Sequence, residues 1–206
     1  MNSLTVPDMV QHLRRGRPFA YSHYGPEEWA AIAAGDGVGE ELRRTLTHFR
    51  PRPFYYALTA PERPVTGKIT GTVAGWVDGD ILGCAQAAGQ LEPFVGILRA
   101  AARHMMYVCP ERLANFAFDR LDCTWAWIVP ERDAHLAREQ ALAALMRYRD
   151  TLDIDLMLFS CGMLAPLLIY DLWAATDGRV TLIDVGGLFD GYMGRSAADY
   201  ERRLTR

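Results

Sequence analysis

The chain has 206 residues, half of them apolar, and a formal net charge of −3 at pH 7. This length and apolar content suit one domain with a substantial core, so we expect residues 1–206 to form a single domain. The mildly acidic balance gives no support for a protein that coats nucleic acid or binds an anionic membrane through its charge.

In the first half of the chain, short helices and strands alternate. Pro26 suits the first turn of a helix, and Glu27 and Glu28 suit the positive end of its dipole. The glycines at 35 and 37 end that helix. We expect helices at 7–15, 26–34 and 40–49, strands at 19–24 and 54–58, and a loop over 59–75.

The second half continues the alternation. Residues 80–102 predict one or two helices with a break near 89–93, and residues 133–147 predict a well-patterned amphipathic helix. The other expected elements are strands at 104–108 and 124–129, a short helix at 111–118 and a polar helix from 196 onward.

The most informative stretch runs from Ile154 to Gly187. Residues 155–159 have the length of a buried strand, Ser160-Cys161-Gly162 breaks it, residues 163–175 have helical spacing, and 180–185 is a second buried strand. A strand that enters a helix through a glycine forms a βαβ unit, whose free helix N–H groups can bind phosphate. A nucleotide-type ligand at Gly162 is therefore the first hypothesis, although one glycine is not a G-x-G-x-x-G fingerprint.

The alternating elements predict a Rossmann-like α/β fold. We expect an open, mostly parallel sheet of about six strands with helices on both faces. Ligands in such folds bind at the carboxyl ends of the strands. The candidate site residues are therefore those that follow the strands, at 23–28, 109–110, 130–131, 160–163 and 184–192.

Cysteine use and hydropathy address the compartment. The four cysteines lie in apolar surroundings without C-x-x-C spacing, which indicates neither a zinc site nor a disulfide framework. The N-terminus lacks the apolar core of a signal peptide, and the most apolar segment, 157–170, is too short to span a bilayer. We therefore expect a cytoplasmic protein without membrane insertion.

Several strand ends resemble motifs of the GT-D fold glycosyltransferases, the DUF1792-like family. Phe19 to Trp29 resembles its R-[FY]-G-D-G-E signature, and Leu158 to Leu172 resembles its G-P-x-A-x-x-L-A-Y-D-L segment. Leu182 to Leu188 resembles its a-I-D-I-G-H segment, and 124–134 resembles its V-P-x-x-N-A element. The resemblance covers nearly the whole chain in order.

The resemblance implies transfer of a sugar from a nucleotide-sugar donor, usually UDP-linked, to a hydroxyl acceptor. The family's D-x-E motif is associated with a divalent metal, Mn²⁺ or Mg²⁺, which neutralises the diphosphate. Carried onto this chain, the resemblance makes Glu28, Asp184 and Asp190 the catalytic candidates. It places the donor against Tyr24, Gly25, Ser160, Gly162, Met163, Gly186 and Tyr192.

The chain departs from this pattern at the metal motif. Aligned on Gly25, the D-x-E triplet becomes Pro26-Glu27-Glu28, which leaves Glu28 as the one retained metal ligand. Glu27 could substitute, but neighbouring helix positions do not face the same way. His23 stands where the family has Arg, and Gly187 where it has His. These departures predict a weakened dependence on the metal.

Two other functions stay open from the sequence. The first is a non-catalytic nucleotide- or nucleotide-sugar-binding module of the same fold, which the missing Asp favours. The second is an unrelated Rossmann-like methyltransferase, although no glycine-rich loop follows the first predicted strand. A nucleic-acid acceptor, such as a hydroxymethylated base, is not excluded but has no support from the net charge. The donor sugar and the oligomeric state are not predicted.

Overall fold

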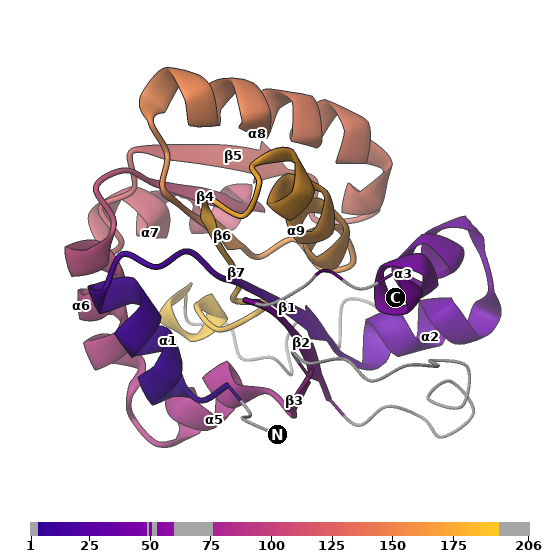
Figure 1. Ribbon diagram of the computed structural model, residues 1–206, viewed down its shortest axis with the longest axis horizontal. Coiled ribbons are helices and arrows are strands. Elements are labelled where there is room, and N and C mark those ends of the chain that lie inside the picture. Colours follow the sequence, from indigo (N-terminus) through magenta and orange to yellow (C-terminus); the bar gives the residue numbers. More distant parts are fainter. Residues whose placement is uncertain (1–3, 49, 51–52, 60–75, 194–206) are drawn as a thin grey trace.

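One parallel sheet organises the computed structural model, which describes residues 4–48, 50, 53–59 and 76–193 (Figure 1). The sheet has seven strands in the order β3-β2-β1-β7-β6-β4-β5. Every neighbouring pair is parallel. The predicted open, parallel α/β sheet is therefore confirmed.

The seven strands include all six that the sequence predicted. They are β1 (Ala20–Tyr24), β2 (Phe54–Leu58), β3 (Trp76–Asp78), β4 (Met105–Pro110), β5 (Trp125–Val129), β6 (Leu156–Phe159) and β7 (Thr181–Asp184). The additional strand, β3, lies at one edge of the sheet and has three residues. Most of the predicted loop, 60–75, and the predicted helix from 196 lie outside the described residues.

The helices begin and end within a few residues of the predicted positions. They are α1 (Val6–Arg14), α2 (Pro26–Ala34), α3 (Gly37–Thr47), α5 (Ile81–Ala87), α6 (Leu91–Ala101), α7 (Ala114–Asp119), α8 (Arg138–Leu152) and α9 (Leu164–Ala175). The helices predicted at 111–118 and 133–147 each start as a separate 3₁₀ turn. These turns are η1 (Glu111–Leu113) and η2 (Ala134–Ala137), and a third, η3 (Asp190–Met193), follows β7.

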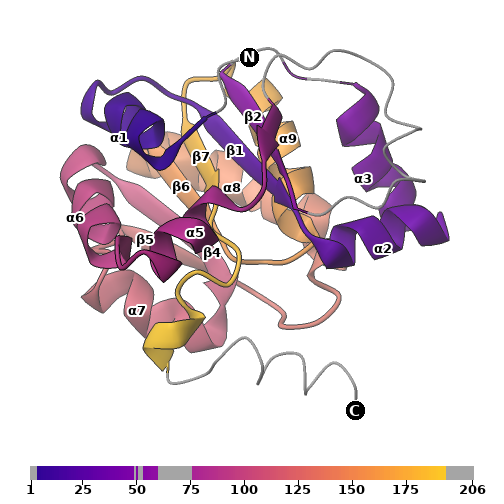
Figure 2. The same ribbon diagram turned by 90° about the horizontal axis from the view of Figure 1, so that it is seen from below.

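Helices cover both faces of the sheet (Figures 1 and 2). Helices α2, α3, α8 and α9 pack on one face around residues such as Trp29, Leu46 and Leu168. Helices α1, α5, α6 and α7 pack on the other, together with Phe189 from the segment after β7. Because the chain leaves the neighbouring strands β4 and β6 toward opposite faces, their carboxyl ends form a topological switch point, where such sheets bind ligands.

The helices α2 and α3 approach each other closely at Gly39. A Cβ at this position would lie 2.0 Å from the carbonyl oxygen of Ala31 and 3.0 Å from the backbone nitrogen of Ile32. The side chain of Asp36 caps α3 by accepting from the Gly39 N–H at 2.7 Å. Only glycine fits this contact, which fixes the position of α2 against the rest of its layer.

All four cysteines are free; Cys84 is exposed and the other three are buried. Burial raises the pKa of the Cys109 and Cys123 thiols to about 12. Among the described residues, no helix combines the length and the apolar character that crossing a bilayer requires.

Candidate functional site

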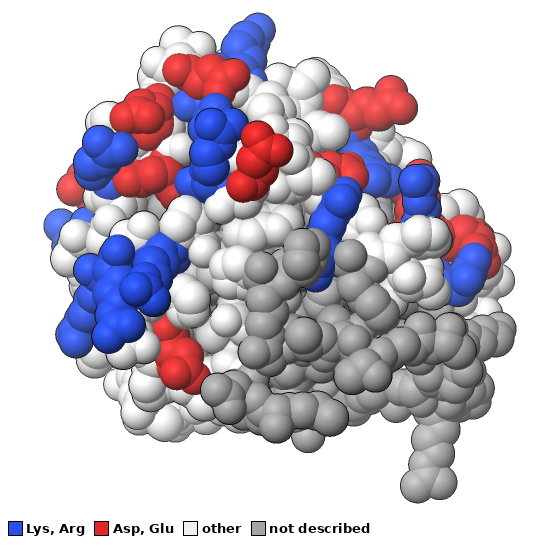
Figure 3. All heavy atoms as spheres, in the orientation of Figure 1, with Lys and Arg blue, Asp and Glu red and all other residues white. Residues whose placement is uncertain are grey.

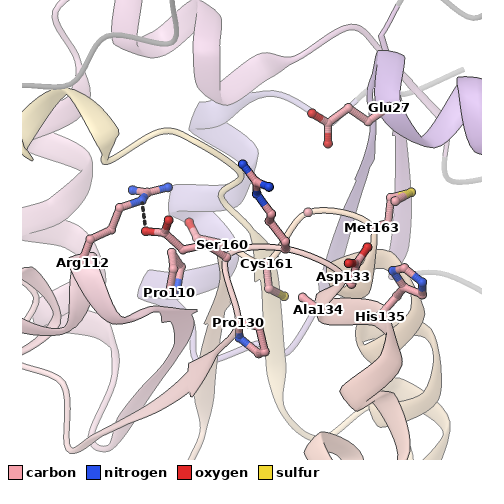
Figure 4. A pocket seen from close by; sticks show the side chains of 13 residues that line it. Glu27, Pro110, Arg112, Pro130, Asp133, Ala134, His135, Ser160, Cys161 and Met163 are labelled. Atoms are coloured by element: carbon pink, nitrogen blue, oxygen red, sulfur yellow. Dashed lines mark ion pairs between the residues drawn. The ribbon is translucent and has the colours of Figure 1, made fainter. Parts of the chain in front are cut away.

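A cleft of about 290 Å³ opens at the carboxyl ends of β4, β5 and β6 (Figure 4). Its walls come from the residues that follow these three strands, and Glu27 of α2 adds to the rim. The lining residues are Glu27, Pro110, Arg112, residues 130–135 and residues 160–163. The cleft thus lies at the switch point, and three of the predicted ligand contacts, Ser160, Gly162 and Met163, line it.

The turn at Gly162 connects β6 to α9 on the floor of the cleft. Gly162 has φ +54°, in the left-handed region that other residues rarely adopt, and a Cβ there would meet no atom within 4 Å. The glycine is therefore required by backbone conformation rather than by lack of space. At the start of α9 the N–H groups of Leu164 and Ala165 donate to the carbonyls of Cys161 and Gly162, at 3.3 and 2.9 Å, and Pro166 has no N–H. The side chains of the cleft are therefore its main groups for holding an anion.

Ser160 ties this floor to the neighbouring strands. Its hydroxyl accepts a hydrogen bond from the Tyr107 hydroxyl at 2.7 Å and donates to the Gly186 carbonyl. Gly186, which also has a positive φ of +48°, begins the segment after β7. The Ser160 hydroxyl therefore holds β4, β6 and this segment together, with both of its hydrogen-bonding roles used inside the protein.

Three basic side chains that the sequence analysis did not single out line the cleft. Arg112 stands on one side and His135 on the other, and Arg132 comes from the segment between β5 and η2. Arg112 makes an ion pair with Glu131 at 3.4 Å, drawn in Figure 4. The signal available in the sequence was their position, since all three follow a strand at the edge where ligands bind.

Asp190, predicted as a catalytic carboxylate, pairs with Arg112. The two side chains are only 15% and 16% exposed, so this ion pair is largely shielded from solvent. The carboxylate of Asp190 is thus engaged by Arg112, which itself lines the cleft.

Glu28 and Asp184 are buried carboxylates at the ends of β1 and β7. Glu28 caps α2, since its Oε2 accepts from the Gly25 N–H at 2.8 Å. Asp184 accepts from the N–H groups of Gly186 and His23, at 3.0 and 3.3 Å. Burial raises the pKa of both carboxyls, and the charge of Glu28 raises that of Asp184 further.

This carboxylate pair lies close behind the cleft. Cys161 lies between the pair and the cleft, since it lines the cleft and feels the charges of both carboxylates. Its pKa is raised first by burial, then by the charge of Asp184 and, less strongly, by that of Glu28. Glu27, the neighbour of Glu28 in the sequence, is exposed and reaches the cleft itself. Of the two adjacent glutamates, Glu28 therefore caps the helix and Glu27 lines the cleft.

His23 occupies the position where the resembled motif has Arg. Its Nε2 lies 2.7 Å from the Thr59 hydroxyl oxygen. Burial lowers its pKa, and the charge of Asp80 opposes that shift. Asp80, which sequence reasoning missed, caps α5 by accepting from the N–H groups of Leu82 and Gly83.

The residues at the motif do not fit a divalent metal. Pro26 offers no ligand atom, and Glu28 Oε2 is occupied by the Gly25 N–H. Both oxygens of Asp184 accept backbone N–H groups. In the described part of the chain, no group of three or more His, Cys, Asp or Glu side chains is placed to hold a metal ion.

Tyr24 and Tyr192 lie away from the cleft. Tyr24 is fully buried, and its hydroxyl is 2.5 Å from the Thr45 hydroxyl, so only its backbone lies at the strand end. Tyr192 donates to Glu92 Oε1 at 2.7 Å, and its ring lies 4.9 Å from that of Phe116. Neither side chain lines this cleft, because one points into the core and the other packs against α6 and α7.

Comparisons with known proteins support the fold. No family model and no curated protein matches the sequence. A DUF1792 glycosyltransferase from Streptococcus sanguinis matches with a TM-score of 0.66 at 14% identity, over 100% of this chain and 85% of that chain. Two further structures of domain of unknown function 1792 match with TM-scores of 0.65 and 0.64 at 12% identity, each over 100% of this chain and 82% of the other. One of these was described as having a distinct glycosyltransferase fold.

At these identities the likeness shows a shared fold. The fold expected from the GT-D motifs is therefore confirmed for the part of the chain that the structure describes.

Proposed function

We propose that this chain is a glycosyltransferase that moves a sugar from a nucleotide-sugar donor, UDP-linked, to a hydroxyl acceptor. The observation that carries the proposal is the cleft at the carboxyl ends of β4, β5 and β6, which gathers the three basic side chains of Arg112, Arg132 and His135. The shared fold with a DUF1792 glycosyltransferase supports the same assignment.

The basic side chains are proposed to hold the donor diphosphate. A guanidinium group matches phosphate oxygens with two parallel hydrogen bonds, and its charge persists at every physiological pH. Arg112, which pairs with Asp190, and Arg132 provide two such groups. Negative charge on the diphosphate grows as the sugar leaves, so these fixed groups stabilise the transition state.

This arrangement takes over the role that the metal has in the resembled family. Because the motif carboxylates are committed to backbone donors, the proposed reaction relies on arginines rather than on Mn²⁺ or Mg²⁺. Glu27 is the proposed general base for the acceptor hydroxyl, since it is exposed at the cleft rim. Glu28 and Asp184 position the ends of β1 and β7 behind it.

A non-catalytic binding module is the second candidate, and one observation favours it. The retained motif carboxylate, Glu28, is buried and serves as a helix cap, so it is not presented to a substrate. In this case the same cleft would bind the nucleotide sugar without turnover. Binding and turnover must therefore be measured separately.

Binding is tested by calorimetric titration of UDP and GDP, with EDTA and again with Mn²⁺. Arg132→Ala should weaken UDP binding at least tenfold, equivalent to about 1.4 kcal/mol. Arg44→Ala is the matched control, because Arg44 is also exposed but lies on α3 outside the cleft. Equal affinities for the two variants would contradict the assignment of this cleft, and UDP binding that requires Mn²⁺ would contradict the role of the arginines.

Turnover is tested by release of UDP from common UDP-sugars in the presence of mixed hydroxyl acceptors. A positioned general base contributes about 10²–10⁴ in rate, so Glu27→Gln should lower release by at least about a hundredfold. Glu139→Gln, an exposed glutamate on α8, should leave it unchanged. If the wild-type protein binds UDP but releases none from any donor, the binding module replaces the enzyme.

A further inference from the structure

A second cleft, of about 700 Å³, lies at the opposite edge of the sheet from the donor cleft. Leu156 and Thr181, the first residues of β6 and β7, form its floor. The end of α1 with the turn that follows it, and the end of α6, form its walls. Since the strands are parallel, this cleft is at their amino ends, whereas the donor cleft is at their carboxyl ends.

The lining of this cleft is strongly basic. Four guanidinium groups and His12 line it, against one carboxylate, that of Asp155. The guanidinium groups belong to Arg14, Arg17, Arg103 and Arg179. The chain as a whole has a net charge of −3, so the positive charge gathered in this cleft does not follow from its overall composition. Figure 3 shows blue side chains gathered over α1 and α6 on the corresponding face.

Two of the four arginines are available to a ligand. Arg103 lies 3.5 Å from both Asp153 and Asp155, and Arg179 pairs with Asp177 at 3.3 Å. Within the described part of the chain, Arg14 and Arg17 make no ion pair, and both are exposed. A basic residue at the end of a helix commonly complements the helix dipole. The helix dipole therefore accounts for Arg14 alone. The other three arginines come from different segments and line the same cleft.

His12 lines the same cleft and has a buried nitrogen without a hydrogen-bond partner in the described part of the chain. Its Nε2 lies 3.5 Å from the Tyr55 hydroxyl, and its Nδ1 is buried with no partner among the described residues. Buried polar atoms in folded proteins are nearly always hydrogen-bonded, so an unpaired one at a cleft calls for a partner. An anionic oxygen would accept a hydrogen bond from this ring and ion pairs from the arginines.

We propose that this cleft binds a compact anion that carries two or more phosphate groups. Arginine is the residue best matched to phosphate, because its planar fork donates two parallel hydrogen bonds. The basic residues surround one concave site rather than forming a stripe, and the remaining surface is net acidic, which disfavours an extended nucleic acid. The site is separate from the donor cleft, so the inference does not depend on the proposed glycosyltransferase activity.

The test is a calorimetric titration with tripolyphosphate. All proteins carry Arg132→Ala, so that the donor cleft contributes little to the signal. Adding Arg14→Ala and Arg17→Ala should weaken binding at least tenfold. The matched control adds Arg44→Ala and Arg147→Ala, which remove the same charge from exposed positions on α3 and α8, and should leave the affinity unchanged.

Vesicle flotation distinguishes the two sources of such an anion. If vesicles of phosphatidylcholine with phosphatidylinositol bisphosphate bind the control but not the Arg14→Ala, Arg17→Ala protein, the ligand is a lipid headgroup. If tripolyphosphate binds and the vesicles do not, the ligand is a free phosphorylated molecule. Equal tripolyphosphate affinities for the two sets of variants would overturn the proposal. Duplex DNA that binds more tightly than tripolyphosphate, and only when both arginines are present, would also overturn it.

Discussion

Replacing Gly39 with alanine should destabilise the protein strongly, although alanine is the better helix former. The new Cβ would lie 2.0 Å from the Ala31 carbonyl oxygen, whereas ordinary van der Waals contact begins near 3.4 Å. The helices would have to separate by roughly an ångström, and the obstructing atoms belong to the backbone of α2, which cannot rotate away. Overpacking of this kind costs about 1–3 kcal/mol and occasionally more.

The helix propensity of alanine offsets about 1 kcal/mol of that cost. With a clash this severe we expect the upper end of the range, so that Gly39→Ala loses about 2 kcal/mol net in free energy of unfolding. Urea unfolding followed by circular dichroism measures the loss as a lower midpoint with an unchanged slope. For a domain whose total stability is of order 5–15 kcal/mol, such a loss is easily resolved.

Gly37→Ala is the matched control for this prediction. Gly37 begins the same helix, and a Cβ there would meet no atom within 4 Å. Alanine at such a position stabilises by about 0.4–1 kcal/mol, mainly by restricting the unfolded chain. If Gly39→Ala is as stable as Gly37→Ala, the two helices are not packed as closely as the structure places them, and the reasoning fails.

Two further variants test the residues behind the donor cleft. Ser160→Ala leaves the buried Tyr107 hydroxyl and the Gly186 carbonyl without this partner, so urea unfolding should show a loss of about 1–3 kcal/mol. A loss below about 0.5 kcal/mol would argue against these two hydrogen bonds of the Ser160 hydroxyl. Glu28→Gln keeps the acceptor for the Gly25 N–H and removes a buried charge. Because burial raises the pKa of Glu28, the folded state binds this proton more tightly than the unfolded chain does. The wild-type protein therefore loses stability as the pH rises above the pKa that Glu28 has in the unfolded chain. The stability of Glu28→Gln relative to wild type should therefore increase between pH 5 and pH 8, and a constant difference would contradict the burial argument.

The sequence predicted the sheet because its central strands are apolar on both faces. Strands β6 and β7 are buried throughout, and continuous apolar runs between glycine-containing turns are typical of parallel sheets. Strand β3 was missed because three residues at an edge carry too little pattern. The 3₁₀ turns η1 and η2 were merged with the helices after them, since both have similar spacing over one turn.

The cleft lies at the edge of the sheet where the sequence analysis placed its candidate site, but the directions of the side chains there could not be predicted. Strand ends converge by topology, so Gly162 could be placed from its position alone. Whether Glu27 or Glu28 faces the cleft depends on how α2 is rotated against β1, which the sequence does not give. The direction of Tyr192 depends on contacts with Phe116 and Glu92, more than 70 residues away in the chain.

The strand order has a consequence for the order of folding. Among the described residues β7 is the last strand in the sequence, but it lies between β1 and β6, where it joins two groups of strands that have no other neighbour in common. Until Thr181–Asp184 have left the ribosome, the group β1, β2 and β3 cannot be joined through β7 to the group β4, β5 and β6. The nascent chain therefore carries two unjoined half-sheets with exposed inner edges, and such edges recruit other strands. The two half-sheets become one sheet only when β7 has been synthesised.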